Sequence, residues 1–379
     1  MIAVLAGLVA APPAGCVPEE QAPDGVEATI DEVLAAVGPA VVQPRLADFR
    51  VRAGGLVAAL EAWRDAVDAG SDGLVERDTA RQAWRDAMFV WQEAEVMQIG
   101  PAASSVTAPL GEDLRDEIYS WPVVNPCRVD QETVEAQWGS PTFFSDNLPN
   151  TYGLDAIEHL LWAGPDNTCP GQVPINADGS WDALGEAGIT ASRASYALAT
   201  AREVERQAGV LLGRWDDGFT PETAYGSRQD ALNALFRSLF YLESVTKDLK
   251  LAEPLGLGAC TTECAGHAES IPSGASTEWI AANLAGFRAL HTAGDDAGLD
   301  DLLRNLGHGA LADDLLVRLD AADAAAISLG LPIDEALAAG PEGVGALHAA
   351  VKAVTDLLKG EVATALALQI PSEAAGDAD

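Results

Sequence analysis

The chain has 379 residues, 48% of them hydrophobic, and a formal net charge of −36 at pH 7. This composition predicts a folded protein with one large or two medium-sized cores and argues against intrinsic disorder. The 58 acidic and 22 basic residues argue against nucleic-acid binding, because phosphate recognition requires a basic surface. An acidic surface favours solubility and can concentrate cations.

The first 16 residues have the pattern of an export signal. A short apolar run ends at Ala14-Gly15-Cys16, which is similar to a bacterial lipoprotein cleavage site, although no basic residue precedes the run and Pro13 replaces an aliphatic residue. We expect a signal peptide over residues 1–15, membrane attachment through lipidated Cys16, and a flexible tether over residues 16–40. This predicts an outer-membrane lipoprotein of the bacterial envelope, facing the periplasm or the cell surface. A simple secretory peptide is the alternative, and no motif names a protein partner.

Apart from Cys16, the chain contains four cysteines, and an even number in an exported protein predicts disulfide bonds. Three pairings are possible, and we favour Cys127–Cys169 and Cys260–Cys264. The Cys-x3-Cys spacing of the second pair also suits half of a zinc site, but we find no second ligand pair at a suitable spacing.

Helical periodicity dominates the chain and strand-type alternation is nearly absent, which predicts an all-α protein. We expect two helical bundles, over residues 41–215 and 220–372, that together form one unit. The long helices are expected near residues 46–69, 75–98, 184–215, 227–251, 277–291, 310–329 and 344–368. Residues 101–150 are irregular, and a loop of this length is usually functional or covers something.

The helix expected at residues 75–98 has one acidic residue in its apolar stripe. Ala80, Trp84, Met88 and Trp91 form the stripe, and Glu95 occupies its next position. We interpret Glu95 as a functional residue or a member of a buried network. The alternative is a charge at the end of the helix, because Gly100-Pro101 follows.

The most unusual stretch is residues 152–162, a short apolar helix that contains an Asp-x-x-Glu-His run. Asp155 lies one helical turn before both Glu158 and His159. Buried carboxylates cost free energy unless they are paired or bind a cation, so the run requires one of these two kinds of partner. His159 either pairs with Asp155, directly or through a shared metal, or makes a hydrogen bond at a helix contact.

Several landmarks occur in a recognisable order. They are Trp84-x6-Trp91-x3-Glu95-x4-Gly100-Pro101, Ile118-Tyr119-Ser120-Trp121-Pro122, Gly153-x4-Glu158-x-Leu160-Leu161-Trp162, residues 249–256, Glu269 with Ser273 and Ser276, and Asn283-Leu284-Ala285-Gly286. Over residues 45–372 the chain resembles the imelysin-like family of bacterial envelope proteins. The resemblance implies two packed four-helix bundles with a site where they meet, export, and expression tied to iron supply. Some members are described as metallopeptidases, and related ones are periplasmic iron-uptake components.

The resemblance also assigns roles to individual residues. Gly153 and Glu158 match the family's Gly-x-His-x-x-Glu motif, whereas Asp155 stands where that motif has its histidine. Asp is a suitable ligand for iron, manganese or calcium and less suited to zinc. Trp121 and Glu269 are implied candidates for the cleft between the bundles, although Glu269 can also be a charge that precedes the helix near Thr277.

These observations predict a protein that binds a divalent or ferric metal ion, with iron favoured. The candidate ligands are Asp155, Glu158, Glu95 and His159. A metallopeptidase that uses Glu158 as base or ligand is one alternative, but the sequence has no His-Glu-x-x-His and only five histidines, so no catalytic residue is assigned. The other alternative is a non-catalytic surface binding protein in which arginine or backbone partners satisfy the two motif carboxylates.

Overall fold

The computed structural model describes residues 24–372 and residue 374, and all regular secondary structure in this part is helical. The predicted signal peptide, Cys16 and the first part of the expected tether lie outside the described residues. Of the helices in the described part, none combines the length and apolarity that a bilayer span requires. The prediction of an all-α protein is confirmed.

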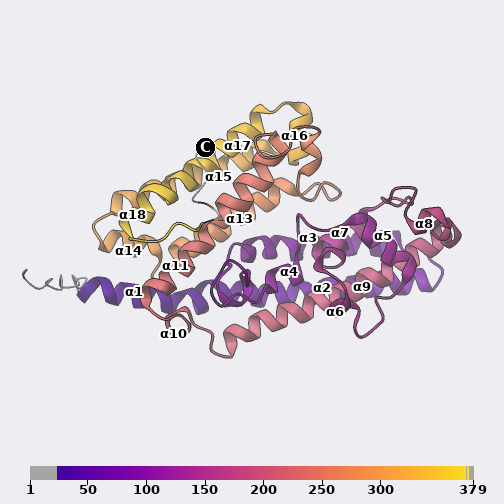
Figure 1. The fold of residues 1–379 in the computed structure, drawn as a ribbon, viewed down its shortest axis with the longest axis horizontal. Helices are drawn as coiled ribbons and strands as arrows, with labels where there is room; N and C mark the ends of the chain where they lie inside the picture. Colours follow the sequence, from indigo (N-terminus) through magenta and orange to yellow (C-terminus); the bar gives the residue numbers. More distant parts are fainter. Residues whose placement is uncertain (1–23, 373, 375–379) are drawn as a thin grey trace, which may run out of the picture.

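The first bundle consists of four helices that run side by side along the longest axis of the molecule (Figure 1): α2 (Gln43–Asp68), α3 (Leu74–Glu95), α7 (Leu154–Trp162) and α9 (Ser180–Asp216). The predicted stripe of α3, from Ala80 to Trp91, is buried in its core. Tryptophan side chains supply much of this core. Their large apolar rings fill the space between the helices, each of which turns one apolar face inward.

The second bundle contains α13 (Ser276–Thr292), α15 (Gly309–Leu329), α17 (Glu342–Leu357), and α11 (Arg228–Leu239) with its π-helical continuation Leu242–Ala252. The expected fold of two packed four-helix bundles is therefore confirmed. The shorter elements of this half are α10 (Pro221–Ala224), α12 (Glu253–Leu255), α14 (Leu299–Asn305), α16 (Ile333–Ala339) and α18 (Ala363–Ala365).

Helices α3 and α13 bring the two bundles together. A Cβ added to Gly286 of α13 would lie 2.3 Å from the carbonyl oxygen of Glu93 in α3, so only glycine allows this approach of the two backbones. One turn earlier, the side-chain amide of Asn283 donates a 2.8 Å hydrogen bond from Nδ2 to the backbone carbonyl oxygen of Gln92. The Asn283–Gly286 landmark of the sequence is thus the contact between the bundles.

The irregular segment 101–150 contains three short helices, α4 (Leu114–Ile118), α5 (Pro126–Glu135) and α6 (Phe143–Asp146). Both predicted disulfides are confirmed. Cys127 of α5 is bonded to Cys169 in the loop after α7, and Cys260 is bonded to Cys264. The first disulfide holds the irregular segment beside the helix that carries the Asp-x-x-Glu-His run.

The expected tether differs from the structure over residues 24–40. Helix α1 (Asp24–Ala36) continues through the π-helical segment Val37–Val42 into α2, and it packs against α14 of the second half. Val33, Leu34, Val37 and Val41 recur at helical spacing and are buried, so this stretch has an apolar face that stabilises it as a helix. The N-terminal helix therefore continues into the first bundle and packs against the second half of the molecule.

A candidate metal-binding pocket between the bundles

A pocket of about 590 Å³ lies between the start of α7 and the loop that leads into α13, a size typical of small-ligand sites. It brings together four residues that the sequence singled out, namely Trp121, Asp155, Glu158 and His159. The remaining wall is largely apolar and includes Pro122, Val124, Pro126, Leu249, Ile271 and Pro272. Glu253 and His267 are two further titratable side chains in this wall.

Helix α7 begins at a position that only glycine can occupy. Gly153 has a φ of +101°, and a Cβ there would lie 2.9 Å from Oδ1 of Asp155 and 3.0 Å from the carbonyl oxygen of Ile118. The indole N–H of Trp84 donates a 2.7 Å hydrogen bond to the carbonyl oxygen of Leu154. The motif glycine therefore lets the Asp155 carboxylate fold back over the helix start, and α3 fixes that start in place.

The Asp155 carboxylate is buried and held by neutral donors. Oδ2 accepts hydrogen bonds from the Ser120 amide at 3.2 Å and the Ser120 hydroxyl at 2.8 Å, and Oδ1 accepts one from the Ala156 amide at 2.9 Å. Burial raises the pKa of Asp155 to about 7, because loss of hydration outweighs these hydrogen bonds. At neutral pH this carboxyl is therefore partly protonated.

Glu158, one turn along the same helix, takes its partners from the other bundle. Oε1 accepts a 3.1 Å hydrogen bond from the Ser273 amide, and Oε2 accepts a 3.2 Å hydrogen bond from the Ser270 hydroxyl. Burial raises the pKa of Glu158 to about 7 as well. Within the described part of the chain, neither Glu158 nor Asp155 forms an ion pair with a basic side chain.

His159 is paired with an aspartate from another helix and not with Asp155. Its Nε2 lies 2.9 Å from Oδ1 of Asp130 in α5. Oδ2 of Asp130 accepts hydrogen bonds from the Thr168 amide at 2.7 Å and the Thr168 hydroxyl at 2.8 Å. Burial alone would raise the pKa of Asp130, but the hydrogen bonds and charge of His159 and the hydrogen bonds from Thr168 lower it. Ionised Asp130 holds the N–H of His159 at Nε2, which leaves Nδ1 as an acceptor or ligand atom when the ring is neutral.

Glu269 belongs to a buried polar cluster next to the pocket. Its Oε1 accepts hydrogen bonds from Tyr119 at 2.7 Å and from Gln92 at 3.0 Å, and its Oε2 lies 3.0 Å from Nζ of Lys250. Lys250 also donates to Oε1 of Gln92 at 2.6 Å. Each of these four side chains is less than 2% exposed, so the cluster is shielded from water.

Glu95 lies in the same cluster and outside the pocket lining. Its Oε1 accepts a 2.9 Å hydrogen bond from Nε of Arg115, and its Oε2 lies 3.9 Å from Nζ of Lys250. The Glu95 side chain is fully buried, so the apolar stripe of α3 ends in a buried network, as one of the two interpretations of the sequence expected. Its carboxylate does not join those of Asp155 and Glu158 in the pocket.

The phenol of Tyr119 connects the cluster to the pocket. Burial and the charges of Glu269, Glu95, Glu158 and Asp155 raise its pKa well above the usual range. All four predicted acidic residues are therefore close enough to act on one hydroxyl group. Two of them have basic partners, and the two that line the pocket do not.

Sequence analysis missed two residues that the geometry makes important. Lys250, the basic residue of the cluster, was part of a landmark but was not recognised as a partner of Glu95 and Glu269. Asp130 lies in a segment expected to be a loop. No local pattern points to it, because its partner His159 is 29 positions away in the sequence.

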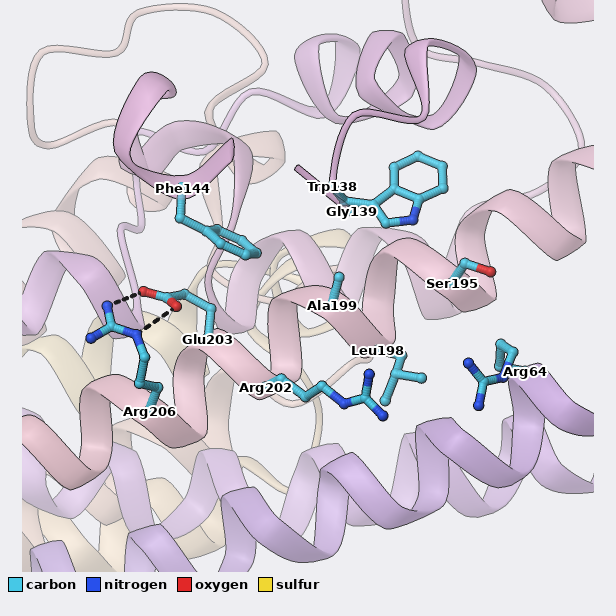
Figure 2. Close-up of a pocket in the computed structure, with 10 residues that line it drawn as sticks. All are labelled: Arg64, Trp138, Gly139, Phe144, Ser195, Leu198, Ala199, Arg202, Glu203 and Arg206. Atoms are coloured by element: carbon cyan, nitrogen blue, oxygen red, sulfur yellow. Dashed lines mark hydrogen bonds and ion pairs between the residues drawn. The ribbon is translucent and has the colours of Figure 1, made fainter. Parts of the chain in front are cut away.

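A second hollow, of about 450 Å³, lies on α9 of the first bundle (Figure 2). Trp138 and Phe144 border it on one side, Arg64, Arg202 and Arg206 are also among its lining residues, and the Arg206 side chain reaches Glu203. The arginines are already engaged: Arg64 with Asp65, Arg202 with Glu61, and Arg206 with Glu203, the last at 2.8 Å. The exposed Arg202–Glu61 pair contributes little to stability, and none of the motif residues lines this hollow.

Comparison with family models shows the family of the chain, and comparison with solved structures shows its fold. The sequence profile described as imelysin, of peptidase group M75, matches residues 42–360. The solved structure of an imelysin-like protein from Psychrobacter arcticum 273-4 superposes with a TM-score of 0.63 at 20% identity, covering 91% of this chain and 97% of that one. A protein named as an iron-regulated protein A precursor, from Parabacteroides distasonis ATCC 8503, superposes with a TM-score of 0.67 at 15% identity, covering 92% and 97%. At these identities the two structures show the fold alone. No curated protein matches the sequence.

Proposed function

The chain belongs to the imelysin family, and from that premise we propose that it is an exported envelope protein that binds a metal ion, with iron favoured, in the pocket between its bundles. One observation carries the proposal. Asp155 and Glu158 are buried carboxyls in a ligand-sized pocket, and no described residue forms an ion pair with either of them. A cation would supply the missing positive charge.

The side chains of the pocket fit a hard cation. Each oxygen of Glu158 accepts one hydrogen bond and so retains a lone pair, and Asp155 keeps accepting capacity at Oδ1. His159 offers Nδ1, and its hydrogen bond to Asp130 is the usual support of a ligating imidazole. Glu158, Asp155 and His159 are therefore the residues that would hold the ion, and Glu95 supports the site from the neighbouring cluster.

The protein supplies an incomplete set of ligands. Among the described residues, no compact group of three donor side chains includes Asp155, Glu158 or His159. An ion in the pocket would therefore keep water molecules or ligands of its own, which the pocket volume allows. When bound, the cation would neutralise the motif carboxylates and displace the protons that they carry at neutral pH. Oxygen ligands favour iron, manganese or calcium over softer ions.

We also propose that the protein reaches the envelope as a lipoprotein anchored through Cys16. The Ala14-Gly15-Cys16 sequence and the two disulfides support this, because disulfides persist in oxidising compartments. Mass spectrometry of the N-terminal peptide from membrane fractions should find a lipid on Cys16, and C16S should release the protein into the soluble fraction. An unmodified Cys16 in membrane-free protein would contradict the anchor.

Elemental analysis of the purified protein and calorimetric titration with Fe²⁺, Fe³⁺, Zn²⁺ and Ca²⁺ test the metal site. We expect one ion per chain, with iron or another hard cation bound most tightly. Glu158→Ala should weaken binding at least about 100-fold, since loss of supporting residues alone typically costs 10- to 100-fold. Glu132→Ala is the matched control, because Glu132 is also a buried glutamate but lies in α5 outside the pocket lining.

The outcomes separate the three functions that the sequence left open. Stoichiometric binding that survives Glu158→Ala would overturn the site, and absence of any binding would favour a non-catalytic binding protein. Peptide hydrolysis that disappears on chelation and returns with metal would favour a metallopeptidase. The Asp130–His159 pair beside Glu158 is the observation that keeps this activity worth assaying, since a carboxylate-oriented imidazole can act as a general base.

A further inference from the structure

The loop that follows α12 brings together three side chains that commonly bind metals. A carboxylate oxygen of Glu253, Sγ of Cys260 and a ring nitrogen of His267 all lie within 4.8 Å of one another. No other group of three such side chains in the described part of the chain is as compact. Glu253 and His267 also line the pocket that contains Asp155 and Glu158.

The loop holds the Glu253 carboxylate in a specific place. Oε2 accepts a 2.9 Å hydrogen bond from the Ala259 amide, and Oε1 lies 3.3 Å from Nδ1 of His267. A Cβ on Gly258 would lie 2.3 Å from Oε2, so a larger residue there would displace the carboxylate. The contact between Glu253 and His267 therefore depends on the backbone of the loop.

Cys264 is a fourth donor in the same loop. Cys264 and His267 are the first and last residues of a 3₁₀ turn, and side chains three residues apart in such a turn lie on the same side. The disulfide joins Cys264 to Cys260, which is already beside Glu253 and His267. Reduction of the disulfide would thus leave two thiol groups, an imidazole and a carboxylate close together, as four possible ligands of one metal ion.

The state of the disulfide decides what these four side chains can bind. Disulfide sulfurs are poor ligands, because the thiolate is the metal-binding form of cysteine. Two thiolates, one imidazole and one carboxylate form a tetrahedral ligand set that suits zinc. Zinc bonds of about 2.0–2.3 Å place such donors roughly 3.3–3.8 Å apart, so the atoms need to move by about 1 Å.

We propose that Glu253, Cys260, Cys264 and His267 form a zinc site that exists only when the Cys260–Cys264 disulfide is reduced. A dithiol reductant supplies two electrons and two protons, and its own sulfurs become a disulfide while Cys260 and Cys264 become thiols. Zinc then binds the two thiolates and the two thiol protons are released to solvent. In the reverse step a disulfide oxidant takes two electrons from the Cys260 and Cys264 thiolates and two protons from solvent and becomes a dithiol, while the Cys260–Cys264 bond re-forms and the ion is expelled.

The disulfide is placed so that it can open without loss of the fold. It closes a loop around three residues, whereas Cys127–Cys169 spans 42 positions, and short loops contribute less to stability in the chain-entropy model. Cys264 is partly exposed, so a reductant can reach it. The four side chains come from residues 253–267 and include none of the ligands proposed on α7, although Glu253 and His267 line the same pocket as Glu158.

The test compares zinc binding by the oxidised and the reduced full-length protein, measured by competition with a chromogenic chelator after anaerobic removal of the reductant. We expect the reduced protein to bind one Zn²⁺ per chain with a Kd at least 100-fold lower than that of the oxidised protein. Bound Co²⁺ should show thiolate charge-transfer absorption in the reduced protein only. Alkylation and peptide mapping should show that Cys260 and Cys264 become accessible on reduction.

Four variants assign the binding. C260S/C264S should abolish the effect of reduction on zinc affinity, and H267A should weaken zinc binding by the reduced protein at least tenfold. C127S/C169S, which keeps the other disulfide, should still gain zinc affinity on reduction, and so should E158Q, which removes a ligand of the proposed α7 site and none of these four side chains. Circular dichroism of each variant checks that it is folded.

Equal zinc affinity of the two redox states, with free Cys260 and Cys264 demonstrated in the reduced sample, would overturn the proposal. Reduction-dependent binding that persists in C260S/C264S would also overturn it. If C127S/C169S does not fold, the Co²⁺ spectrum of reduced C260S/C264S decides: thiolate absorption there would place the site elsewhere. Loss of the reduction-dependent zinc binding in E158Q, but not in C260S/C264S, would assign the zinc to the Glu158 site and contradict this one.

Discussion

The backbone amide of Ser273, in the segment that leads into the second bundle, donates a 3.1 Å hydrogen bond to Oε1 of Glu158 in the first bundle. The Ser270 hydroxyl donates to the other oxygen at 3.2 Å. The motif glutamate is therefore a contact between the bundles as well as a pocket residue. A proton or a cation on Glu158 would change both the charge of the pocket and the hydrogen bonds that Glu158 accepts from Ser270 and Ser273.

The first prediction concerns the pH dependence of stability. The folded-state pKa of Glu158, about 7, is higher than the unfolded value of 4.5, so its contribution is fully present below pH 4.5 and is lost as the pH rises through 7. Glu158→Gln keeps the shape and removes the proton equilibrium. Relative to wild type, the variant should gain about 3 kcal/mol in unfolding free energy between pH 4.5 and 7.5. Urea denaturation at a series of pH values measures this difference.

The exposed carboxyl of Glu361 provides the control for that series. Glu361→Gln should follow the wild-type profile throughout, because the side chain is exposed in both the folded and the unfolded protein. A constant difference between Glu158→Gln and wild type at every pH would show that Glu158 does not titrate in this range. The buried environment described for the pocket would then be incorrect.

The second prediction is that Lys250 stabilises the buried cluster. Lys250→Met removes the positive charge that faces Glu269 and leaves Gln92 without one of its donors. Loss of one partner from a buried ion pair typically costs 3–5 kcal/mol. Adding Glu269→Gln should restore part of the loss, which a double-mutant cycle would measure as a coupling of about 1–3 kcal/mol. Lys352→Met, which alters an exposed pair on α17, should cost at most about 1 kcal/mol.

Lys250 also shows how far sequence reasoning reached. The stripe from Ala80 to Trp91 predicted α3, because side chains one turn apart share a face whatever the rest of the fold does. Such periodicity identified most long helices and placed Glu95 in the core. It could not pair Lys250 with Glu269 or Asp130 with His159. Those contacts depend on how helices that are distant in the sequence pack together, and local sequence patterns do not specify this packing.

The same limit applies to the second ligand pair near Cys260 and Cys264. The sequence contains no second pair of zinc ligands at a conventional spacing from these cysteines. The structure instead supplies Glu253 and His267 from either side of the same loop. His267 follows Cys264 by three residues, and that spacing was a signal available in the sequence. Glu253 was not predictable, because its position depends on the turn at Gly258.

The third prediction tests the contact between the bundles. Gly286→Ala places a Cβ 2.3 Å from the backbone oxygen of Glu93, and a backbone atom cannot rotate away as a side chain can. We expect a loss of about 1–3 kcal/mol from overpacking, even though Ala is the better helix former. Gly345→Ala in α17 is the matched control: nothing lies within 4 Å of the added Cβ, so a gain of about 0.5–1 kcal/mol is expected. Thermal denaturation of both variants gives the comparison, and equal shifts would contradict the close approach of α3 and α13.

The fourth prediction places acid sensitivity in the second bundle. His291 is fully buried beside Phe287, and burial, followed by the charges of Arg304 and Arg288, lowers its pKa to about 4. A histidine whose folded-state pKa lies below the unfolded value of 6.5 stabilises the protein above pH 6.5. That stability is lost as the pH falls toward 4, because the unfolded chain binds the proton more readily.

His291→Leu should therefore lose less stability than wild type as the pH falls. The difference in unfolding free energy should grow in favour of the variant by about 3 kcal/mol between pH 6.5 and 4. His267→Leu, at a half-exposed position, is the comparison and should show a much smaller change. Guanidinium denaturation at fixed ionic strength separates the two, and a pH-independent difference for His291→Leu would mean that the buried ring is not kept neutral by its surroundings.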